Sequence, residues 1–378
     1  MDNANIQEVL NTMVLTRLNH FHLPELLQLY EHFGSATAIV EHQHHLRDAV
    51  PNCPQRIVDS FKSFGEAFRR AETEMEYDLQ HDILPLCITD NHYPQRLKEC
   101  PDAPILLYYK GNVNLNSARI LSVVGTRHCT PYGQDVVRKL MIDLKRLCPN
   151  LLVVSGLAYG VDINAHREAL NNNLPTIGVL AHGLDDLYPS AHRSTASEML
   201  SCGGLLTEFM TMTQADKKNF VRRNRIIAGM ADATLVIESA DKGGGLITAK
   251  LARSYDREVF AVPGRANDRY SMGCNHLIRD HVAALVTDGT DLLKALGWED
   301  EQKVRKARQE GVERQLFPNL TAEESVIVEA LQQQNDQQIN TLTVKTNLPV
   351  GLLTAQLFEL EMKGVVRTMA GGIYHLIG

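Results

Sequence analysis

The feature that constrains the fold most is an alternation, between residues 119 and 298, of short apolar runs with longer helical segments. The runs are rich in β-branched residues and lie at 120–124, 151–155, 176–181, 205–209, 234–238, 258–262 and 284–287. Runs that are apolar throughout, rather than at every second residue, are typical of parallel strands buried on both faces. The alternation therefore predicts an α/β domain with a doubly wound, Rossmann-like parallel sheet.

Other stretches of the chain differ from this domain in pattern. Residues 1–78 show the apolar spacing of amphipathic helices and predict a small helical domain. Residues 79–298 hold the α/β domain, whose proline-bearing first part, 80–118, is expected to wrap the edge of the sheet. Residues 299–318 mix charges of both signs with few apolar residues and predict a solvated linker, which leaves 319–378 as a third folded unit.

Residues 319–378 carry the pattern of three helices followed by a β-hairpin, which describes a winged helix. Thr321 and Glu324 have the spacing of a capping box and mark the start of its first helix. The third helix, expected over residues 352–363, is the element that often reads duplex DNA in such domains. Here it carries Glu359, Glu361 and a single lysine, whereas a duplex-reading helix presents basic side chains to phosphates. The pattern favours contact with another protein over contact with duplex DNA.

Three glycine-bearing turns follow predicted strands of the α/β domain, at 125–127, 155–162 and 243–249. Turns that follow parallel strands share the carboxyl edge of the sheet, where ligands bind. Helix N-termini at that edge offer free N–H groups to an anion, and glycine lets the anion approach the backbone. The turns match neither the P-loop motif nor Gly-x-Gly-x-x-Gly, so they predict an anion site without a nucleotide cofactor.

The densest basic run of the chain, 217–225, lies at the start of a predicted helix. Residues 217–227 hold five basic side chains and no acidic one, although the whole chain has a formal net charge of −7. Positive charge at a helix start is unfavourable unless an anion is present. The run also includes Phe220, and a base can stack on such a ring while Lys and Arg hold the backbone. These features favour nucleic-acid phosphate as the ligand over the alternative of a solvated basic face.

The sequence shows no recognisable catalytic or metal-binding set. Asp162 and His166 are four residues apart, a spacing that we interpret as a contact on a helix surface rather than a catalytic dyad. The histidines at 42–45 lack a carboxylate or cysteine at ligand spacing, and the acidic pair at 185–186 lacks further carboxylates. We therefore expect a binding protein rather than an enzyme, with no metal and no cofactor.

Cysteine usage and the N-terminus bear on the compartment in which the protein works. The seven cysteines are scattered and include no Cys-x-x-Cys pair, which argues against a disulfide framework. The first residues lack the basic start and apolar run of a secretory signal, and no apolar run approaches the ~20 residues that span a bilayer. We expect a cytoplasmic protein with no membrane partner.

Several motifs of the α/β domain occur together in a specific order. Val-Val-Gly-Thr-Arg (123–127) is followed by Ser-Gly-Leu-Ala-Tyr-Gly-Val-Asp-Ile-Asn-Ala-His (155–166) and Phe-Val-Arg-Arg-Asn-Arg-Ile-Ile-Ala-Gly (220–229). Gly-Leu-Ile-Thr-Ala (245–249) and Val-Phe-Ala-Val-Pro-Gly (259–264) come next. In this order they resemble the DNA-processing protein A (DprA, also called Smf) family, over nearly all of residues 119–286. Many members also have a helical N-terminal domain and a winged-helix tail.

The resemblance implies a non-enzymatic protein that binds single-stranded DNA, protects incoming strands during natural transformation and loads the RecA recombinase onto them. It also implies a homodimer, which we expect to form around residues 277–285. The implied DNA-binding residues are Gly125, Arg127, Ser155, Gly156, Gly160, Lys217, Lys218, Phe220, Arg222, Arg223 and Asn224. Arg127 and Lys217 would hold phosphate and Phe220 would stack on a base, while the glycines and Ser155 would offer backbone contacts.

The helical N-terminal domain resembles helix-hairpin-helix or SAM-like modules, but residues 18–22 lack their DNA-binding glycine hairpin. An enzymatic alternative is a nucleotide-cleaving protein of the lysine-decarboxylase-like (LOG) type, which shares a similar α/β fold. Its Pro-Gly-Gly-x-Gly-Thr-x-x-Glu turn supplies a catalytic Glu, and here Ala249 and Lys250 stand where that carboxylate would fall. A second alternative is a winged-helix regulator of duplex DNA, against which the acidic third helix counts.

Overall fold

The computed structural model describes residues 3–19, 23–50, 53–298, 320–369 and 372–376. The chain divides into two compact units, Met1–Glu299 and Asp300–Gly378. The expected linker at 299–318 lies outside the described residues. No helix within the described ranges is long and apolar enough to cross a bilayer.

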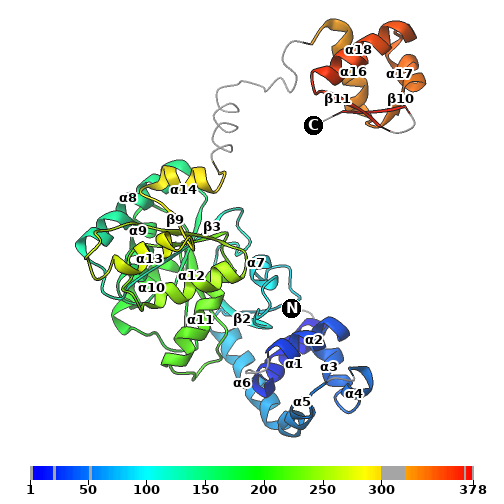
Figure 1. Ribbon diagram of the computed structural model, residues 1–378. Coiled ribbons are helices and arrows are strands. Elements are labelled where there is room, and N and C mark those ends of the chain that lie inside the picture. Colours follow the sequence, from blue (N-terminus) through cyan, green and yellow to red (C-terminus); the bar gives the residue numbers. More distant parts are fainter. Residues whose placement is uncertain (1–2, 20–22, 51–52, 299–319, 370–371, 377–378) are drawn as a thin grey trace. The chain divides into compact units, whose positions relative to one another are not determined.

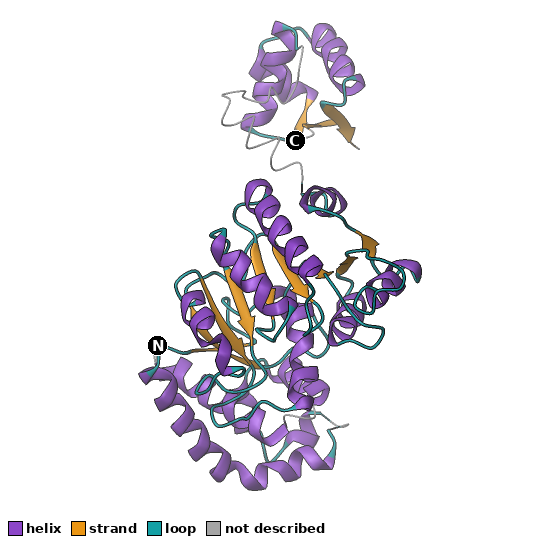
Figure 2. Ribbon diagram, turned by 90° about the vertical axis from the view of Figure 1, so that its left-hand side faces the viewer, coloured by secondary structure: helices purple, strands orange, loops and turns teal. Residues whose placement is uncertain are grey.

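The core of the first unit is a nine-stranded sheet with the strand order β1-β2-β6-β5-β4-β3-β7-β8-β9. Figure 2 shows the strands of this sheet in orange, with helices packed around them. Its strands are β1 (Leu84–Cys87), β2 (Leu106–Gly111), β3 (Ile120–Val124), β4 (Leu152–Ser155), β5 (Thr176–Val179), β6 (Gly203–Thr207), β7 (Ala233–Val236), β8 (Glu258–Ala261) and β9 (Ala284–Leu285). Every pair from β6 across to β9 is parallel. The predicted doubly wound α/β domain is confirmed.

Helices cover both faces of this sheet (Figure 1). They are α8 (Pro131–Leu147), α9 (Val161–Asn171), α10 (Arg193–Met199), α11 (Lys217–Gly229), α12 (Gly244–Ser254), α13 (Met272–Arg279) and α14 (Gly289–Ala295), with a 3-10 turn at Ser190–His192. Leu121 and Val123 of β3 pack with α8, α9 and α14, whereas Ile120 and Val124 face the side of α11, α12 and α13. This alternation explains why every residue of the run except Ser122 is apolar, since each face of the strand is buried. The Ser122 hydroxyl donates to the Ile227 carbonyl at 2.5 Å, so its buried polar atom is satisfied.

Residues 80–118 do not merely wrap the edge of the sheet, and this prediction is corrected. They supply β1 and β2, with the short helix α7 (Gln95–Lys98) between them. β2 pairs antiparallel with β6, and β1 pairs antiparallel with β2, so the sheet is mixed. Pro85 lies in β1, which is an edge strand and therefore tolerates a residue without an N–H donor.

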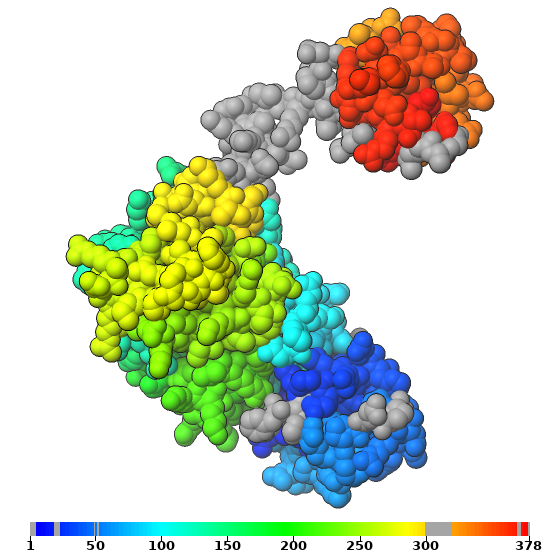
Figure 3. Space-filling model, viewed as in Figure 1, coloured from blue at the N-terminus to red at the C-terminus, as the bar shows by residue number. Residues whose placement is uncertain are grey.

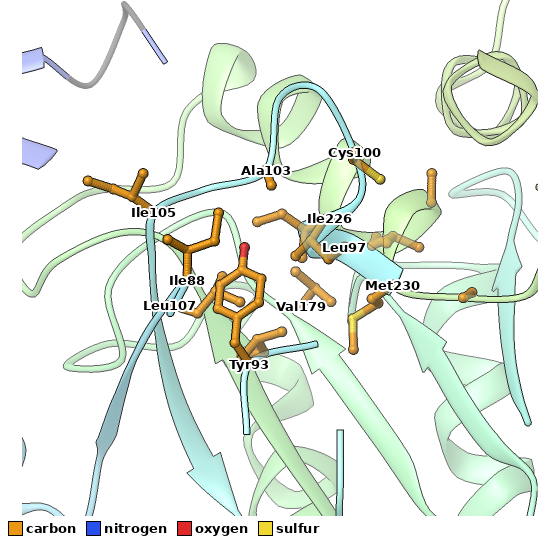
Figure 4. Packing of buried hydrophobic residues seen from close by; sticks show 14 of the residues in the cluster. Ile88, Tyr93, Leu97, Cys100, Ala103, Ile105, Leu107, Val179, Ile226 and Met230 are labelled. Atoms are coloured by element: carbon orange, nitrogen blue, oxygen red, sulfur yellow. The ribbon is translucent and has the colours of Figure 1, made fainter. Parts of the chain in front are cut away.

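The segment that holds β1, α7 and β2 also packs against α11. Tyr93 and Leu97 are fully buried, and Figure 4 shows them packed with Ile226 of α11 and with Met230, the residue that follows this helix. The Tyr93 hydroxyl donates to the Pro104 carbonyl at 2.6 Å, so its buried polar atom is satisfied. The position of α11, which carries the basic run, is therefore fixed by the hydrophobic core.

The N-terminal helices pack against the sheet and belong to the same unit. They are α1 (Asn3–Asn19), α2 (Leu23–Phe33), α3 (Ala36–Glu41), α4 (Leu46–Ala49), α5 (Gln55–Ser60) and α6 (Phe64–Gln80), with a 3-10 turn at Phe61–Ser63. Val9 and Met13 of α1 share a buried cluster with Leu106 and Tyr108 of β2. Figure 3 accordingly shows the blue surface of these helices continuous with the surface of the α/β domain.

The second unit has the three helices and the β-hairpin predicted for a winged helix, with an additional short strand between the first two helices. Its elements are α16 (Ala322–Gln333), β10 (Gln337–Gln338), α17 (Ile339–Thr346), α18 (Val350–Met362), β11 (Val366–Met369) and β12 (Ile373–Leu376). The predicted capping box is present, because Thr321 Oγ1 accepts from Glu324 N and the Glu324 carboxylate accepts from Thr321 N. The core includes Leu342, Leu353 and Leu357, all fully buried.

Candidate nucleic-acid interface

A cavity of about 750 Å³ lies at the carboxyl ends of β3 and β7. The chain proceeds from β3 to β6 on one side of β3, and then places β7, β8 and β9 on the other side. Such a reversal of strand order leaves a crevice in which open α/β sheets bind ligands. The turn at 125–128, the start of α11, the loop at 240–243 and the first turn of α12 line this cavity, together with Arg269 and Tyr270.

The turn after β3 is held by backbone and carboxylate contacts. Thr126 N donates to the Glu238 carbonyl at 2.7 Å, and Val161 N donates to the Thr126 carbonyl at 3.0 Å. The buried Glu238 carboxylate accepts from the N–H of Thr130 at 2.8 Å and from its hydroxyl at 2.5 Å. These contacts fix the exposed Arg127 at the wall of the cavity.

The first eight residues of α11 contribute four of the predicted residues to the lining of the cavity: Lys217, Phe220, Arg223 and Asn224. Asp216 is the N-cap of this helix, and its side chain accepts from Asn219 N at 2.7 Å. The basic run therefore lies inside the helix. The carboxylate of Asp216, directly before the run, already offsets the positive charge at the start of the helix. The electrostatic need for an external anion at this end is smaller than the basic run alone suggests.

Phe220 lies in the wall of the cavity rather than in the core, because its ring is only half-buried. The Arg127 guanidinium lies 5.0 Å from the ring centroid, and the Arg223 guanidinium lies 5.8 Å from it. The centroid of the Tyr188 ring lies 5.9 Å from that of Phe220, and the planes of the two rings are inclined by 57°. Cation–π contacts of this kind hold an aromatic ring in place beside a cation. The cavity thus presents an aromatic surface and a guanidinium side by side.

Arg223 lines the cavity but its side chain is buried beneath the wall. Its Nη1 donates to the Gly156 carbonyl at 2.7 Å and also to the Val179 carbonyl. Burial lowers the pKa of Arg223 to about 10, while the nearby Asp162 carboxylate acts in the opposite direction. Burial raises the pKa of Asp162, and the Arg223 charge opposes that rise. The buried charges of Arg223 and Asp162 therefore compensate each other beneath the wall of the cavity. Arg223 is accordingly a positioning residue in this structure.

Three of the predicted backbone-contact residues lie behind the wall of the cavity. Ser155 is fully buried, and its hydroxyl donates to the Val123 carbonyl at 2.6 Å. A Cβ on Gly156 would lie 2.5 Å from Arg223 Nη1, and a Cβ on Gly160 would lie 2.1 Å from the Thr126 carbonyl oxygen. Gly160 also has a φ of +79°, which favours glycine. Close packing explains these residues, whereas Gly125 does line the cavity.

Arg222 and Lys218 are not among the residues that line this cavity. Arg222 Nη2 donates to Glu208 Oε2 at 2.7 Å, and its guanidinium lies 5.4 Å from the Phe209 ring. It faces a separate cavity of about 200 Å³ next to the N-terminal helices. Neighbouring residues on a helix point about 100° apart, so the side chains of Arg222 and Arg223 lie in different environments.

Sequence reasoning did not identify four residues that the structure places around the cavity: His128, Lys242, Arg269 and Tyr270. The His128 and Tyr270 rings stack at 6.0 Å, and the Arg269 guanidinium lies 5.6 Å from the Tyr270 ring. Lys242 directly precedes the glycine turn that opens α12, and this adjacency is the one signal that could have found it. Its neighbour Gly243 is the N-cap of α12. Glycine has no side chain that could accept a hydrogen bond, so the first N–H groups of this helix have no capping side chain.

The pair of Asp162 and His166 does not form the predicted contact on a helix surface, because both residues are buried. The His166 ring faces Thr176, with Nδ1 2.7 Å from the hydroxyl oxygen. Burial, with the Arg223 and His192 charges, lowers the pKa of His166 to about 3. In the described ranges, no group of three His, Cys, Asp or Glu side chains is placed to hold a metal ion.

The chain matches known proteins over both units. Residues 85–297 match the family model of DNA recombination-mediator protein A, and residues 313–372 match the DprA winged helix domain. DNA processing protein DprA of Streptococcus pneumoniae is 42% identical over 206 residues, which cover 54% of this chain and 72% of that protein. Protein Smf of Escherichia coli is 32% identical over 304 residues, 78% of either chain.

The chain belongs to the DprA/Smf family. The X-ray structure of DprA from Streptococcus pneumoniae superimposes with a TM-score of 0.64 at 33% identity, and the match covers 78% of this chain and 98% of that one. A DprA structure from Helicobacter pylori, described for its unique single-stranded DNA binding mode, has a TM-score of 0.51 at 27% identity. That match covers 57% of this chain and 95% of the other. The DprA/Smf matches support a role in DNA processing and recombination, and they do not favour the LOG alternative.

Proposed function

We propose that the chain binds single-stranded DNA in the cavity beside β3 and α11. The observation that carries the proposal is the composition of the cavity wall. Five basic side chains line it against two acidic ones, in a chain with a formal net charge of −7, and aromatic rings lie among them. The basic residues are Arg127, Lys217, Arg223, Lys242 and Arg269. A basic groove with stacking platforms is the general design of single-strand binding sites.

The aromatic residues make a single strand a better ligand than a duplex. Phe220 and Tyr188 are both accessible from the cavity, and a base can stack on such a ring only if it has left its own stack. Recognition through phosphates and ring faces does not depend on base identity. We therefore expect binding that is indifferent to sequence and prefers unpaired strands.

The experiment is a titration of labelled single-stranded and duplex oligonucleotides of equal length at several salt concentrations. Four of the lining cations, all except the buried Arg223, can reach phosphate, so the slope of log K against log salt should be roughly −3 for the single strand. The duplex should bind more weakly at every salt concentration. An affinity that does not change with salt, or a preference for the duplex, would show that the cavity has another ligand.

Within the family role, we infer that the chain is not an enzyme and works in the cytoplasm, where it protects incoming strands during transformation and loads RecA onto them. Family membership and the cavity wall support this inference. The measurement is RecA filament assembly on strands already covered by a single-strand binding protein. Assembly that is no faster with the chain present would contradict RecA loading.

We infer further that the chain acts as a homodimer through the end of the sheet at β9. β9 is an edge strand, and Leu285 is 50% exposed, whereas Leu277 is buried in its own core and is not free to contact a partner. Two-fold dimers are the commonest protein assembly. Light scattering at micromolar concentration should give twice the 42.2 kDa mass of one chain, and Leu285→Lys should lower it. A mass of one chain for the unaltered protein would contradict the dimer.

A further inference from the structure

The third helix of the winged helix, α18, has apolar residues on two opposite faces. Leu353, Leu357 and Leu360 form the inner face and are fully buried in the core of the unit. On the opposite side, four further positions are exposed and follow one another at intervals of four, three and four residues: Gly351, Ala355, Phe358 and Met362. We call these four residues the outer seam. Intervals of four and three place residues in one line along a helix, as in the seams between paired helices.

The outer seam holds side chains that are unusually exposed for their type. Five large apolar side chains in the described ranges are more than 60% exposed: Leu79, Met212, Val344, Phe358 and Met362. Phe358 at 61% and Met362 at 72% lie one helical turn apart on the seam. Single exposed apolar residues are common, but an aligned pair that continues a line of small residues marks an interaction surface.

The small residues at the other end of the seam fit a helical partner. An added Cβ on Gly351 would meet no atom within 4 Å, so the space outside this position is open. Small side chains let the backbone of a second helix approach closely at Gly351 and Ala355. Phe358 and Met362 then supply the large anchors that a helix-binding face needs.

The charges around the seam select the kind of partner. Glu359 and Glu361 lie on its two flanks, and the nearby Lys363 is already bonded to the Glu324 carboxylate at 2.7 and 2.8 Å. Residues 320–376 contain six acidic and three basic residues. Acidic flanks repel DNA phosphates and also repel the same face of a second copy, whereas they attract lysine and arginine.

We propose that the outer seam of α18 is the docking site for an amphipathic helix of a partner protein. The partner helix presents apolar side chains at intervals of three and four residues and carries lysine or arginine on both flanks. Its apolar side chains pack on Phe358 and Met362, and its basic side chains pair with Glu359 and Glu361. This site lies in the second unit and does not depend on the DNA-binding cavity.

The test uses the full chain and a labelled synthetic helix with leucine along one seam and arginine on both flanks. A scrambled peptide of the same composition, in which the leucines do not form a line, controls for attraction to the acidic chain. Phe358→Glu and Met362→Glu together should weaken binding of the seam peptide by roughly tenfold or more, as expected when two apolar anchor residues are lost. Val344→Glu is the matched control, because Val344 is 82% exposed on α17 and lies outside the seam.

A charge reversal makes the test more specific. Glu359→Lys should weaken binding of the arginine-flanked peptide and strengthen binding of a glutamate-flanked one. Glu361 is left unchanged because its carboxylate accepts from the Thr368 N–H and hydroxyl, both at 2.9 Å. Circular dichroism of each variant confirms that the unit remains folded.

Several results would overturn the proposal. One is equal binding of the seam peptide and the scrambled peptide, and another is equal binding by the seam variants and the unaltered chain. A loss of duplex DNA binding in the Phe358→Glu, Met362→Glu variant would make the seam a DNA surface. A fall in the mass of the protein in sedimentation, seen in that variant but not in Val344→Glu, would make the seam an interface between copies of this chain.

Discussion

Replacing Arg223 by methionine is expected to lower the free energy of unfolding by about 3–5 kcal/mol, because it leaves a buried carboxylate without its compensating charge. Arg223 is 3% exposed and Asp162 is 8% exposed. The Arg223 guanidinium also satisfies the Gly156 and Val179 carbonyls, which would lose their donor. Denaturant unfolding at pH 7, followed by circular dichroism, measures the loss.

Two variants make this measurement decisive. Asp162→Asn in the Arg223→Met background removes the uncompensated charge, and it should recover part of the lost stability. Arg222→Met removes the same charge one residue away, but Glu208 keeps its contact with Arg225, so the loss should be smaller. Equal losses for Arg222→Met and Arg223→Met would contradict the role given to the buried pair.

The free energy of unfolding should also depend on pH through Asp78 of α6. This side chain is 1% exposed, and neither of its carboxylate oxygens has a hydrogen-bond partner. Burial raises the pKa of Asp78 to about 8, and the Glu74 carboxylate adds to the rise while Arg70 opposes it. The folded protein therefore keeps a proton on Asp78 over a pH range in which the unfolded chain has lost it.

The sign of the effect follows from this difference in proton binding. Below about pH 4 both states hold the proton, and between about pH 4 and pH 8 the folded state alone holds it, so stability falls as the pH rises. The full effect amounts to about 6 kcal/mol, since the pKa differs by about four units and one unit is equivalent to about 1.4 kcal/mol. Asp78→Asn preserves the shape of the side chain and cannot lose a proton, so it should remove this dependence.

The measurement compares unfolding of the unaltered chain and of Asp78→Asn at pH 5.5 and pH 8.5. The stability of the variant relative to the unaltered chain should rise by about 3 kcal/mol between the two pH values. Glu76→Gln is the matched control on α6, because Glu76 is exposed and should show no such change. The same relative stability at both pH values would mean that Asp78 is ionised in the folded protein.

The sheet and its functional edge could be predicted because their signals are local. Four of the five residues at 120–124 are apolar, and β3 has the same bounds as this run. The spacing of Thr321 and Glu324 predicted a capping box, and both of its hydrogen bonds are present. β1 and β2 were missed because β2 pairs with β6, almost one hundred residues away, and no local pattern indicates such a partner.

The cavity could be predicted only in part, for a similar reason. Arg127, Lys217 and Phe220 come together because turns and helix starts share the carboxyl edge of a parallel sheet. The separate roles of Arg222 and Arg223 depend on where Glu208 and Asp162 lie after folding. Arg269 and Tyr270 reach the cavity from a loop without regular spacing, so no periodic pattern indicates them.

The central claim is that single-stranded DNA binds in the cavity beside α11. Arg127 and Arg222 test it directly, because they carry equal charges and were both predicted to contact DNA, yet Arg127 alone of the two lines the cavity. The measurement is the affinity of the full chain for a labelled single strand after Arg127→Ala or Arg222→Ala, with melting curves for both variants.

The account predicts that Arg127→Ala weakens binding by roughly 1.5–3 kcal/mol, which is more than about tenfold, and leaves the melting temperature unchanged because the side chain is exposed. Arg222→Ala should leave the affinity within about threefold of the unaltered chain, as expected for a residue outside the binding site. Equal losses of affinity in the two variants, or a loss confined to Arg222→Ala, would contradict the claim.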